Sequence, residues 1–330
     1  MNILLISSLH TGGKEKRFKQ LRSFLNEKNI EMESIVFKNL NNNSSNKFPL
    51  IVQRIYSLYK LLFKYKPKVI HSWSSYLTLI CSPYCFLYNV KLIDSSISTN
   101  GKDGSISFKI IRRLAIIISN HLTVNSLVAI LNLKLSSKVI LIRNAIKINS
   151  HKKLVRRNGN LNFWFVSRLE PGKRVDLFIK IASQLNKFYP EFEFNIVGDG
   201  SLMSSYLKKY NNLSFLKFRG YDSDFLKKIH KGDICMLISD SEGTPNILLE
   251  FMSVGIPPIY YNLETDIDSP ILNNFTGFNV NSLEDLESKV IELYNNPVLY
   301  DEMSKNAVKH VLKNYNINKN FNRFIELYYK

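Results

Sequence analysis

The stretch SEGTPNILLEFMSVGIPP, residues 241–258, contains a helix whose two ends are marked by their residue types. Thr244 is of the type that caps a helix N-terminus. Pro245 suits the first turn, where an amide hydrogen would have no partner in any case. Gly255, followed at once by two prolines, ends the helix. We therefore expect a short helix that begins directly after a loop.

Two glutamates of this stretch have different surroundings. Glu242 ends the loop, whereas Glu250 lies within the helix. The apolar stripe of the helix is Ile247, Phe251 and Val254, and helical spacing places Glu250 on this inward face. Burial of an ionised carboxylate needs strong compensation, by a protein donor or by a polar ligand such as a sugar hydroxyl. An internal ion pair is the structural alternative.

Short apolar runs alternate with amphipathic segments along the chain, which is typical of parallel sheets covered by helices. In the first half we expect strands at 2–7, 34–37, 68–71, 91–94, 121–124 and 138–142, with helices from about Lys14 and Pro49, around Leu77 and near Ile110, and one more after 124. In the second half we expect strands at 161–167, 194–198, 214–218, 233–239 and 257–261, with helices from Val175 and Leu202, near Phe225, after Thr244 and from about Pro297 to Lys330, interrupted at 314–316.

The periodicity lapses between residues 147 and 160, a polar and basic stretch. We place the domain boundary there. The fold class predicted is α/β, with two tandem doubly wound, Rossmann-like domains that face an interdomain cleft. Ligands of such sheets gather beyond the carboxyl ends of the strands.

Composition limits the class of protein. With 330 residues and 45% hydrophobic content, the chain can form two ordinary domains. Three cysteines fit neither a disulfide framework nor a zinc pattern, so a reducing cytoplasm is expected. The N-terminus lacks the features of a secretory signal, and the longest apolar stretch, Tyr76–Val90, is too short to span a bilayer.

The formal charge of +18 indicates an anionic partner or a strongly solvated surface. Basic residues alternate with apolar ones in KEKRFKQLR (14–22), QRIYSLYKLLFKYKPK (53–68) and FKIIRR (108–113). Such basic amphipathic helices suit an anionic membrane surface, a nucleic acid or water. No nucleic-acid-binding motif accompanies them, so we expect no nucleic-acid partner.

Basic residues follow the first strand of the second half, in FVSRLEPGKRVDLFI (165–179). Arg168 comes directly after the strand, and Lys173 and Arg174 precede the next helix. A planar guanidinium and a mobile ammonium together can neutralise a diphosphate without a metal. A surface ion pair is the alternative interpretation.

Glycines occupy two of the expected strand-to-helix turns. Gly12 and Gly13 follow the first strand, and Gly198 and Gly200 flank Asp199 after a later one. Glycine allows backbone amides to approach a phosphate, but it also allows a tight turn. We weight a structural role above direct nucleotide contact for Gly198.

The two glutamates, separated by seven residues that include Gly243, Pro245 and Asn246, resemble the signature of family-4 retaining glycosyltransferases. The resemblance implies that Glu242 addresses the donor sugar and Glu250 the ribose, while the helix N-terminus near Thr244 faces the diphosphate. It also implies that Arg168 and Lys173 bind the diphosphate. The usual glycine before the arginine is Ser167 here.

Further positions of the resemblance are looser. The family uses a loop like Gly12–Gly13 near the donor diphosphate and the acceptor, and its main chain approaches the base near the positions of Gly220 and Tyr221. His71, at the end of an expected strand, matches an acceptor-side histidine, although a structural role is the alternative. Relatives often carry a second histidine where Trp73 stands, and many carry one after the strand that ends at Asp94, where none is present.

The resemblance implies a retaining enzyme of GT-B architecture that moves a sugar from a nucleoside diphosphate to an acceptor. Residues 1–148, joined by a C-terminal helix at about 316–330, would bind the acceptor, and 149–315 the donor. The acceptor expected is a lipid-linked saccharide of bacterial surface polysaccharide synthesis, handled at the inner face of the cytoplasmic membrane. No metal or other cofactor is expected. The alternatives are a nucleotide-sugar epimerase or hydrolase, or a silent nucleotide-sugar-binding subunit; an oxidoreductase lacks its G-x-G-x-x-G.

Overall fold

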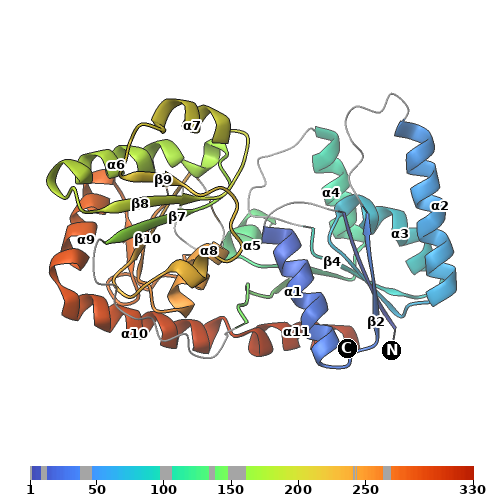
Figure 1. Ribbon diagram of the computed structural model, residues 1–330. Helices are drawn as coiled ribbons and strands as arrows, with labels where there is room; N and C mark the ends of the chain where they lie inside the picture. Colours follow the sequence, from blue (N-terminus) through green and yellow to red (C-terminus); the bar gives the residue numbers. More distant parts are fainter. Residues whose placement is uncertain are drawn as a thin grey trace. The chain divides into compact units, whose positions relative to one another are not determined.

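The computed structural model describes residues 2–8, 13–37, 47–96, 106–133, 138–147, 161–240, 242, 244–262 and 269–330. It divides the chain into two compact units. Unit 1 comprises Met1–Ala145 and Asn320–Lys330, and unit 2 comprises Ile146–Lys319. Each unit contains a six-stranded parallel sheet with helices on its faces (Figure 1). The predicted fold class, two doubly wound α/β domains, is confirmed.

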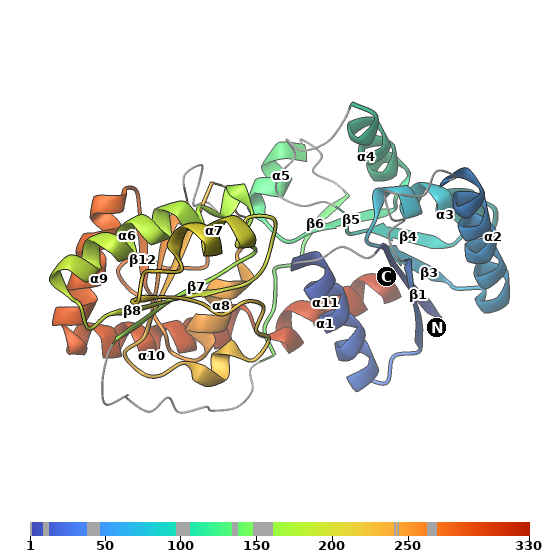
Figure 2. The same ribbon diagram turned by 45° about the horizontal axis from the view of Figure 1, so that its top comes forward.

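Unit 1 has the strand order β2-β1-β3-β4-β5-β6. Its strands are β1 (Ile3–Ser8), β2 (Met32–Phe37), β3 (Val69–Ser72), β4 (Lys91–Asp94), β5 (His121–Val124) and β6 (Val139–Leu141). Its helices are α1 (Gly13–Glu27), α2 (Lys47–Tyr65), α3 (Ser75–Leu87), α4 (Ile106–Ile118), α5 (Leu127–Leu133) and most of α11 (Ile317–Tyr329). Right-handed connections place α1 on one face of the sheet and α2 and α3 on the other, as Figures 1 and 2 show.

The two faces of the unit 1 sheet pack against different helices. Leu4 and Ile70 point toward α2 and α3, where they join an apolar cluster that includes Leu62. On the other face, α11 packs against α1 through Phe24 and Phe321, whose ring centroids are 5.8 Å apart. The last helix therefore completes the core of the unit that contains the N-terminus.

His71 lies at the centre of the unit 1 sheet and not at its edge. Its strand continues to Ser72, and the imidazole is fully buried. Nδ1 lies 2.7 Å from the hydroxyl of Tyr328 on α11, and Nε2 lies 2.6 Å from the hydroxyl of Ser95. Burial, together with the nearby charge of Arg17, lowers the pKa of His71 to about 3. The ring is therefore neutral and ties α11 to the sheet.

Unit 2 has the strand order β12-β11-β10-β7-β8-β9. Its strands are β7 (Asn162–Val166), β8 (Glu193–Val197), β9 (Leu216–Phe218), β10 (Ile234–Ser239), β11 (Pro258–Asn262) and β12 (Phe278–Val280). Its helices are α6 (Val175–Phe188), α7 (Met203–Tyr210), α8 (Asn246–Ser253), α9 (Leu283–Asn295) and α10 (Pro297–Asn314), with short 3-10 turns at Pro171–Lys173 and Phe225–Lys228.

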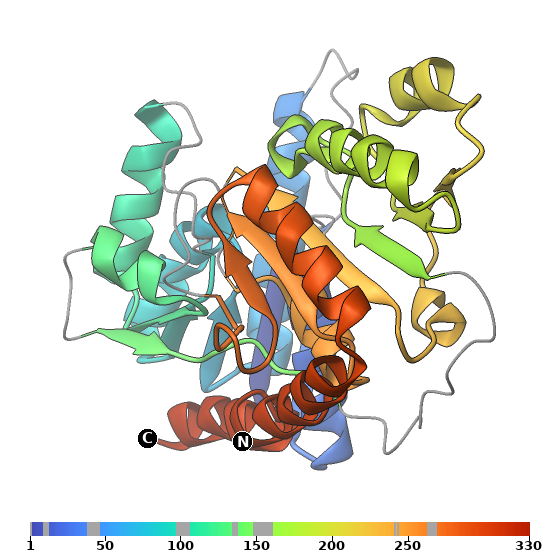
Figure 3. The same cartoon turned by 90° about the vertical axis from the view of Figure 1, so that its left-hand side faces the viewer.

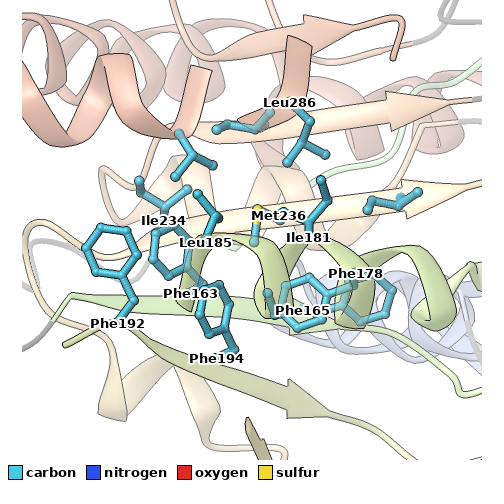
Figure 4. Packing of buried hydrophobic residues seen from close by; sticks show 14 of the residues in the cluster. Phe163, Phe165, Phe178, Ile181, Leu185, Phe192, Phe194, Ile234, Met236 and Leu286 are labelled. Atoms are coloured by element: carbon cyan, nitrogen blue, oxygen red, sulfur yellow. The ribbon is translucent and has the colours of Figure 1, made fainter. Parts of the chain in front are cut away.

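Strand alternation gives unit 2 one apolar cluster on each face of the sheet. Phe163 and Met236 belong to the cluster under α6 and α9, whereas Trp164 and Leu237, one residue further along, belong to the cluster under α8 and α10. Figure 4 shows the first cluster, in which Phe163 and Phe194 from paired strands stack with ring centroids 4.8 Å apart. Two buried faces explain why these strands are almost continuously apolar.

Three local expectations differ from the structure. Neither β12 nor α9 was anticipated, and the segment near Phe225 is a 3-10 turn of four residues instead of a helix. Figure 3 shows α9 beside α6 over the sheet, where its buried side chains join the same cluster. Within the described ranges, none of the helices is both long and apolar enough to cross a membrane.

Because the folded pKa of His71 lies below the unfolded value, unfolding favours proton uptake by this residue. Its contribution to stability is complete above about pH 6.5 and is lost as the pH falls toward 3. We expect the stability advantage of the native chain over His71→Gln, measured by urea unfolding, to shrink by roughly 2 kcal/mol between about pH 7.5 and about pH 5. Parallel pH profiles for the two proteins would contradict a buried neutral imidazole.

Candidate functional site

The strand order of unit 2 reverses between β7 and β10. The chain builds β8 and β9 on one side of β7, and β10 to β12 on the other. In open parallel sheets, ligands bind outside the carboxyl ends of the strands at such a reversal. Arg168 and Lys173 follow β7, and Glu242 follows β10. The three residues predicted to be catalytic therefore come from the two loops at this point.

The structure brings Lys173 and Glu242 into direct contact. Lys173 Nζ donates a hydrogen bond to Glu242 Oε1, and the two groups form an ion pair. The side chains are 18% and 23% exposed, so the pair is partly desolvated but still accessible from solvent. Charges in such surroundings interact more strongly than on an open surface. The pair gives unit 2 a cation and a carboxylate at the crevice predicted by the topology.

The loop that carries Lys173 is attached to the end of β10. The carbonyl oxygen of Gly172 accepts hydrogen bonds from Asp240 N at 3.0 Å and from Ser239 Oγ at 3.1 Å. These bonds join the residue before Lys173 to the strand that leads into Glu242. Main-chain hydrogen bonds therefore connect the two loops that carry the ion pair.

The predicted glycine turn after β8 packs against the loop after β7. Gly198 has a φ of +139°, and a Cβ added there would lie 1.8 Å from Ser167 O. A Cβ on Gly200 would lie 2.6 Å from Leu169 O. Leu169 N donates to Asp199 O at 2.9 Å. The two glycines are required by this close approach of two main chains, which positions the segment around Arg168.

The same edge continues to β9. Gly198 N donates to Gly220 O at 2.8 Å, and Gly220 has a φ of +66°. Tyr221 is 81% exposed, so its ring is available to a ligand. Main-chain hydrogen bonds thus connect the loops after four neighbouring strands, in the spatial order β9, β8, β7 and β10.

The two arginines near Lys173 differ in what they contact. Arg168 is exposed at the end of β7. Arg174 takes a left-handed backbone conformation, with φ of 43°, and its guanidinium binds Asp176 at 3.0 Å and Asp240 at 3.2 Å. The hydrogen bond to Asp176 is the main reason that the pKa of Arg174 is raised. Sequence reasoning overlooked Asp240, although its position directly after β10 was a usable signal.

Helix α8 begins later than expected, and its buried surface is wider than the predicted apolar stripe. Pro245 occupies the N-cap position, so the predicted capping by Thr244 is wrong. The predicted end is confirmed, because Gly255 has a φ of +83° directly after the helix. The buried residues are Leu248, Leu249, Phe251 and Met252, whereas the predicted stripe members Ile247 and Val254 are only half-buried.

The reason for the wider surface is that α8 packs against α10 as well as against β10 and β11. Glu250 is half-buried and interacts electrostatically with Cys235 on β10, so the expectation of a carboxylate on the fully inward face is corrected to one at its border. Asn246 is the first residue of the helix and is also half-buried. Both side chains remain accessible to a ligand.

Some predicted residues lie elsewhere or outside the described ranges. Gly12 and Gly243 belong to the residues that are not described. Gly13 is the first residue of α1, directly at the carboxyl edge of the unit 1 sheet. His71 lies within that sheet, as described above. Among the described residues, no group of three or more His, Cys, Asp or Glu side chains is placed to hold a metal ion.

Comparison with known families assigns the region of the chain that contains these residues. The model of the family described as "Glycosyl transferases group 1" matches residues 146–310, which is half of the chain and nearly all of unit 2. The chain belongs to this family. The resemblance inferred from the two glutamates is therefore confirmed.

Two curated relatives illustrate the similarity in sequence. UDP-Gal:alpha-D-GlcNAc-diphosphoundecaprenol alpha-1,3-galactosyltransferase of Escherichia coli is 30% identical over 182 residues, which are 53% of this chain and 46% of that protein. The O-antigen biosynthesis glycosyltransferase WbnH of E. coli is 29% identical over 153 residues, 46% and 43% of the two chains. The matched regions thus span less than half of either relative.

The fold similarity covers the whole chain. The crystal structure of HepE from Anabaena, determined in complex with UDP and glucose, superposes with a TM-score of 0.75 and 15% identity over 99% of both chains. At this identity the likeness establishes the fold and nothing further. The fold is that of the GT-B glycosyltransferases.

Proposed function

We propose that this protein is a retaining glycosyltransferase that moves a sugar from a nucleoside diphosphate to an acceptor without a metal ion. The observation that carries the proposal is the Lys173–Glu242 ion pair at the strand-order reversal of unit 2. It provides a cation for a diphosphate and a carboxylate for sugar hydroxyls at one place. Family membership over the same residues supports it.

The proposed chemistry begins with an exchange of partners. The donor diphosphate takes the ammonium of Lys173 and the exposed guanidinium of Arg168, and Glu242 is released to bind hydroxyls of the sugar. Glu250 binds the ribose. The bond between the anomeric carbon and the diphosphate oxygen then breaks while the acceptor oxygen bonds to the same face. The acceptor proton passes to the leaving diphosphate, whose charge the two basic residues stabilise.

The acceptor we propose is a lipid-linked saccharide of bacterial surface polysaccharide synthesis. The E. coli relative that is 30% identical is named for a diphosphoundecaprenol acceptor, and another relative is named for O-antigen biosynthesis. Such an acceptor requires the enzyme to work at the inner face of the cytoplasmic membrane. An anionic membrane surface, and no nucleic acid, is accordingly the proposed macromolecular partner.

Unit 1 carries a surface suited to that membrane. Lys60, Lys64, Lys66 and Lys68, at and beyond the end of α2, are all exposed. Helix α4 presents an apolar stripe to solvent, spaced for one helical face: Ile106, Ile110, Leu114 and Ile117, with exposed fractions of 80%, 51%, 44% and 64%. Exposed Lys109 and Arg113 lie on the same helix. This combination of exposed basic residues and an exposed apolar stripe is typical of interfacial helices.

Lys173→Ala and Glu250→Ala should each reduce kcat/KM for the donor by roughly thirty- to a thousandfold, equivalent to about 2–4 kcal/mol. Each change removes one charged contact to the nucleotide sugar. The measurement is sugar transfer from a panel of nucleotide sugars, with thermal shift to show donor binding. Lys180→Ala and Glu302→Ala, which alter exposed residues of the same unit, are the matched controls.

The outcomes separate the alternatives. Full activity in folded Lys173→Ala and Glu250→Ala proteins would remove the site assignment. Donor turnover that is independent of any acceptor would identify an epimerase or hydrolase, and an absence of both donor binding and turnover would identify a silent subunit. The anomeric configuration of the product, measured by NMR, tests retention.

Transfer should also be insensitive to chelation. The positive charge on the leaving diphosphate is supplied by Lys173 and Arg168, so kcat/KM should be unchanged in excess EDTA. Loss of activity in EDTA that is restored by added manganese would show that these side chains are insufficient.

Binding of the full-length protein to vesicles that contain anionic lipid should decline as salt is raised. Each basic residue near such a surface adds about 1 kcal/mol, and salt screens this attraction. Replacing Lys60, Lys64, Lys66 and Lys68 together by glutamine should weaken sedimentation with these vesicles. The matched control replaces four exposed lysines of unit 2: Lys180, Lys187, Lys208 and Lys227. No binding at low salt, or equal binding to neutral vesicles, would exclude the membrane surface.

A further inference from the structure

A cavity of about 430 Å³ lies within unit 1, separate from the residues of unit 2 described above. Its walls are mainly apolar and come from α2, α3 and α4, with Ile55, Leu58, Ile80 and Phe108 as representative members. Its size is within the range of small-molecule sites in proteins. A free sugar or nucleotide would leave hydroxyls unpaired against such walls, so they favour a ligand with a hydrocarbon part.

The cavity also has polar lining, from the carboxyl ends of the first strands of the sheet. Ser8 at the end of β1, Ser74 after β3 and Ser96 after β4 all line it. Strand order reverses in unit 1 between β1 and β3, because β2 lies on the other side of β1. This is the position at which sheets of this kind bind polar ligand groups. The cavity therefore combines the sheet edge at which polar ligand groups bind with an apolar wall.

Basic side chains give the polar lining a positive balance. Lys14, in the first turn of α1, and Arg54 of α2 both line the cavity. Lys14 Nζ donates a hydrogen bond to the carbonyl oxygen of Ser96. Lys14 and Arg112 both interact electrostatically with the buried carboxylate of Asp94. Among the described residues that line the cavity, Lys14 and Arg54 are basic, and Arg112 adds a further cation near Asp94. Burial is the main reason that the pKa of Lys14 is lowered, so an added anion would relieve an unfavourable environment.

Asp94 is already committed to protein donors. Its Oδ1 accepts from Ser96 N at 2.6 Å and its Oδ2 from Thr78 Oγ1 at 2.8 Å. Trp73 also lines the cavity, but its ring packs against His71 and Phe18 and its indole nitrogen is buried. Among the described lining residues, Lys14 and Arg54 are the basic groups that an anionic ligand would meet.

We propose that the cavity binds the phosphate groups and the first carbons of the lipid that carries the acceptor saccharide, that is, a prenyl diphosphate. The inference rests on the proposed function for the lipid-linked nature of the acceptor. The phosphates contact Lys14 and Arg54, and the hydrocarbon lies along α2 and α3. The saccharide itself is bound elsewhere.

The test uses geranyl diphosphate as a soluble probe of the full-length protein, with binding measured by calorimetry and by quenching of tryptophan fluorescence. We expect it to bind at least about tenfold more tightly than inorganic diphosphate or geraniol, a difference of about 1.4 kcal/mol. The reason is that inorganic diphosphate lacks the hydrocarbon part and geraniol lacks the phosphates. A short-chain phosphatidylglycerol is the fourth ligand. It distinguishes the acceptor lipid from an ordinary anionic phospholipid.

Two variants act on the two halves of the cavity. Lys14→Gln should remove charge recognition, and Ile55→Trp should fill the apolar part, each weakening geranyl diphosphate at least about tenfold. Lys14→Arg should retain binding. Lys19→Gln and Val52→Trp, on exposed positions of the same two helices outside the cavity lining, are the matched controls and should bind as the native chain does.

The outcomes distinguish this inference from the proposed function. Sugar transfer without geranyl diphosphate binding, or with binding unaffected by Lys14→Gln and Ile55→Trp, would overturn the cavity assignment and leave the transferase intact. Binding that responds to both variants in a protein that transfers no sugar would uphold the cavity and remove the transferase. Equal affinity for phosphatidylglycerol or inorganic diphosphate would overturn the assignment to a prenyl diphosphate.

Discussion

The candidate donor site depends on one steric constraint, the close approach of two main chains at the carboxyl edge of the unit 2 sheet. Gly198 and Gly200 lie against the backbone of Ser167 and Leu169 at distances that no side chain permits. The carbonyl of Gly172 then connects the same loop to β10. Because the loops are joined by backbone bonds, the positions of Lys173 and Glu242 follow from the sheet and not from the flexible ends of their side chains.

Arg174 and Lys173 are neighbouring basic residues with different partners. Arg174 is held by two aspartates and turned by its left-handed backbone, so its charge is used within the protein. Lys173, one residue earlier, is paired within the described ranges with Glu242, which is itself a candidate ligand group. The proposed exchange of that partner for a diphosphate would leave no partly buried charge uncompensated, because Glu242 would gain sugar hydroxyls at the same time. A lysine suits this exchange, since its ammonium is a mobile point charge.

Much of this arrangement was predictable from local sequence. Strand ends, glycine turns and the stop of α8 are short-range signals, and they placed Arg168 just after β7 and Lys173 and Glu242 in the loops that follow β7 and β10. Features set by distant residues were not predictable. The extra buried face of α8 depends on α10, and the burial of His71 depends on Tyr328, which is 257 residues away. The cavity of unit 1 likewise combines positions from four helices and four strand ends, and Lys14 after the Gly-Gly pair was its local signal.

The two faces of the unit 1 sheet explain why polar residues there have unlike roles. On the α11 face, His71, Ser95 and Thr123 form a buried chain of hydrogen bonds that Tyr328 closes, so these groups satisfy one another and hold the last helix. On the other face, Asp94 is bound by Ser96 and Thr78, and within the described ranges the charged groups that act on it, Lys14 and Arg112, are both basic. A closed polar network stabilises a fold, whereas an excess of positive charge favours an anionic ligand. Neighbouring positions of the paired strands, such as His71 on β3 and Asp94 on β4, therefore have different roles, because strand alternation directs them to opposite faces of the sheet.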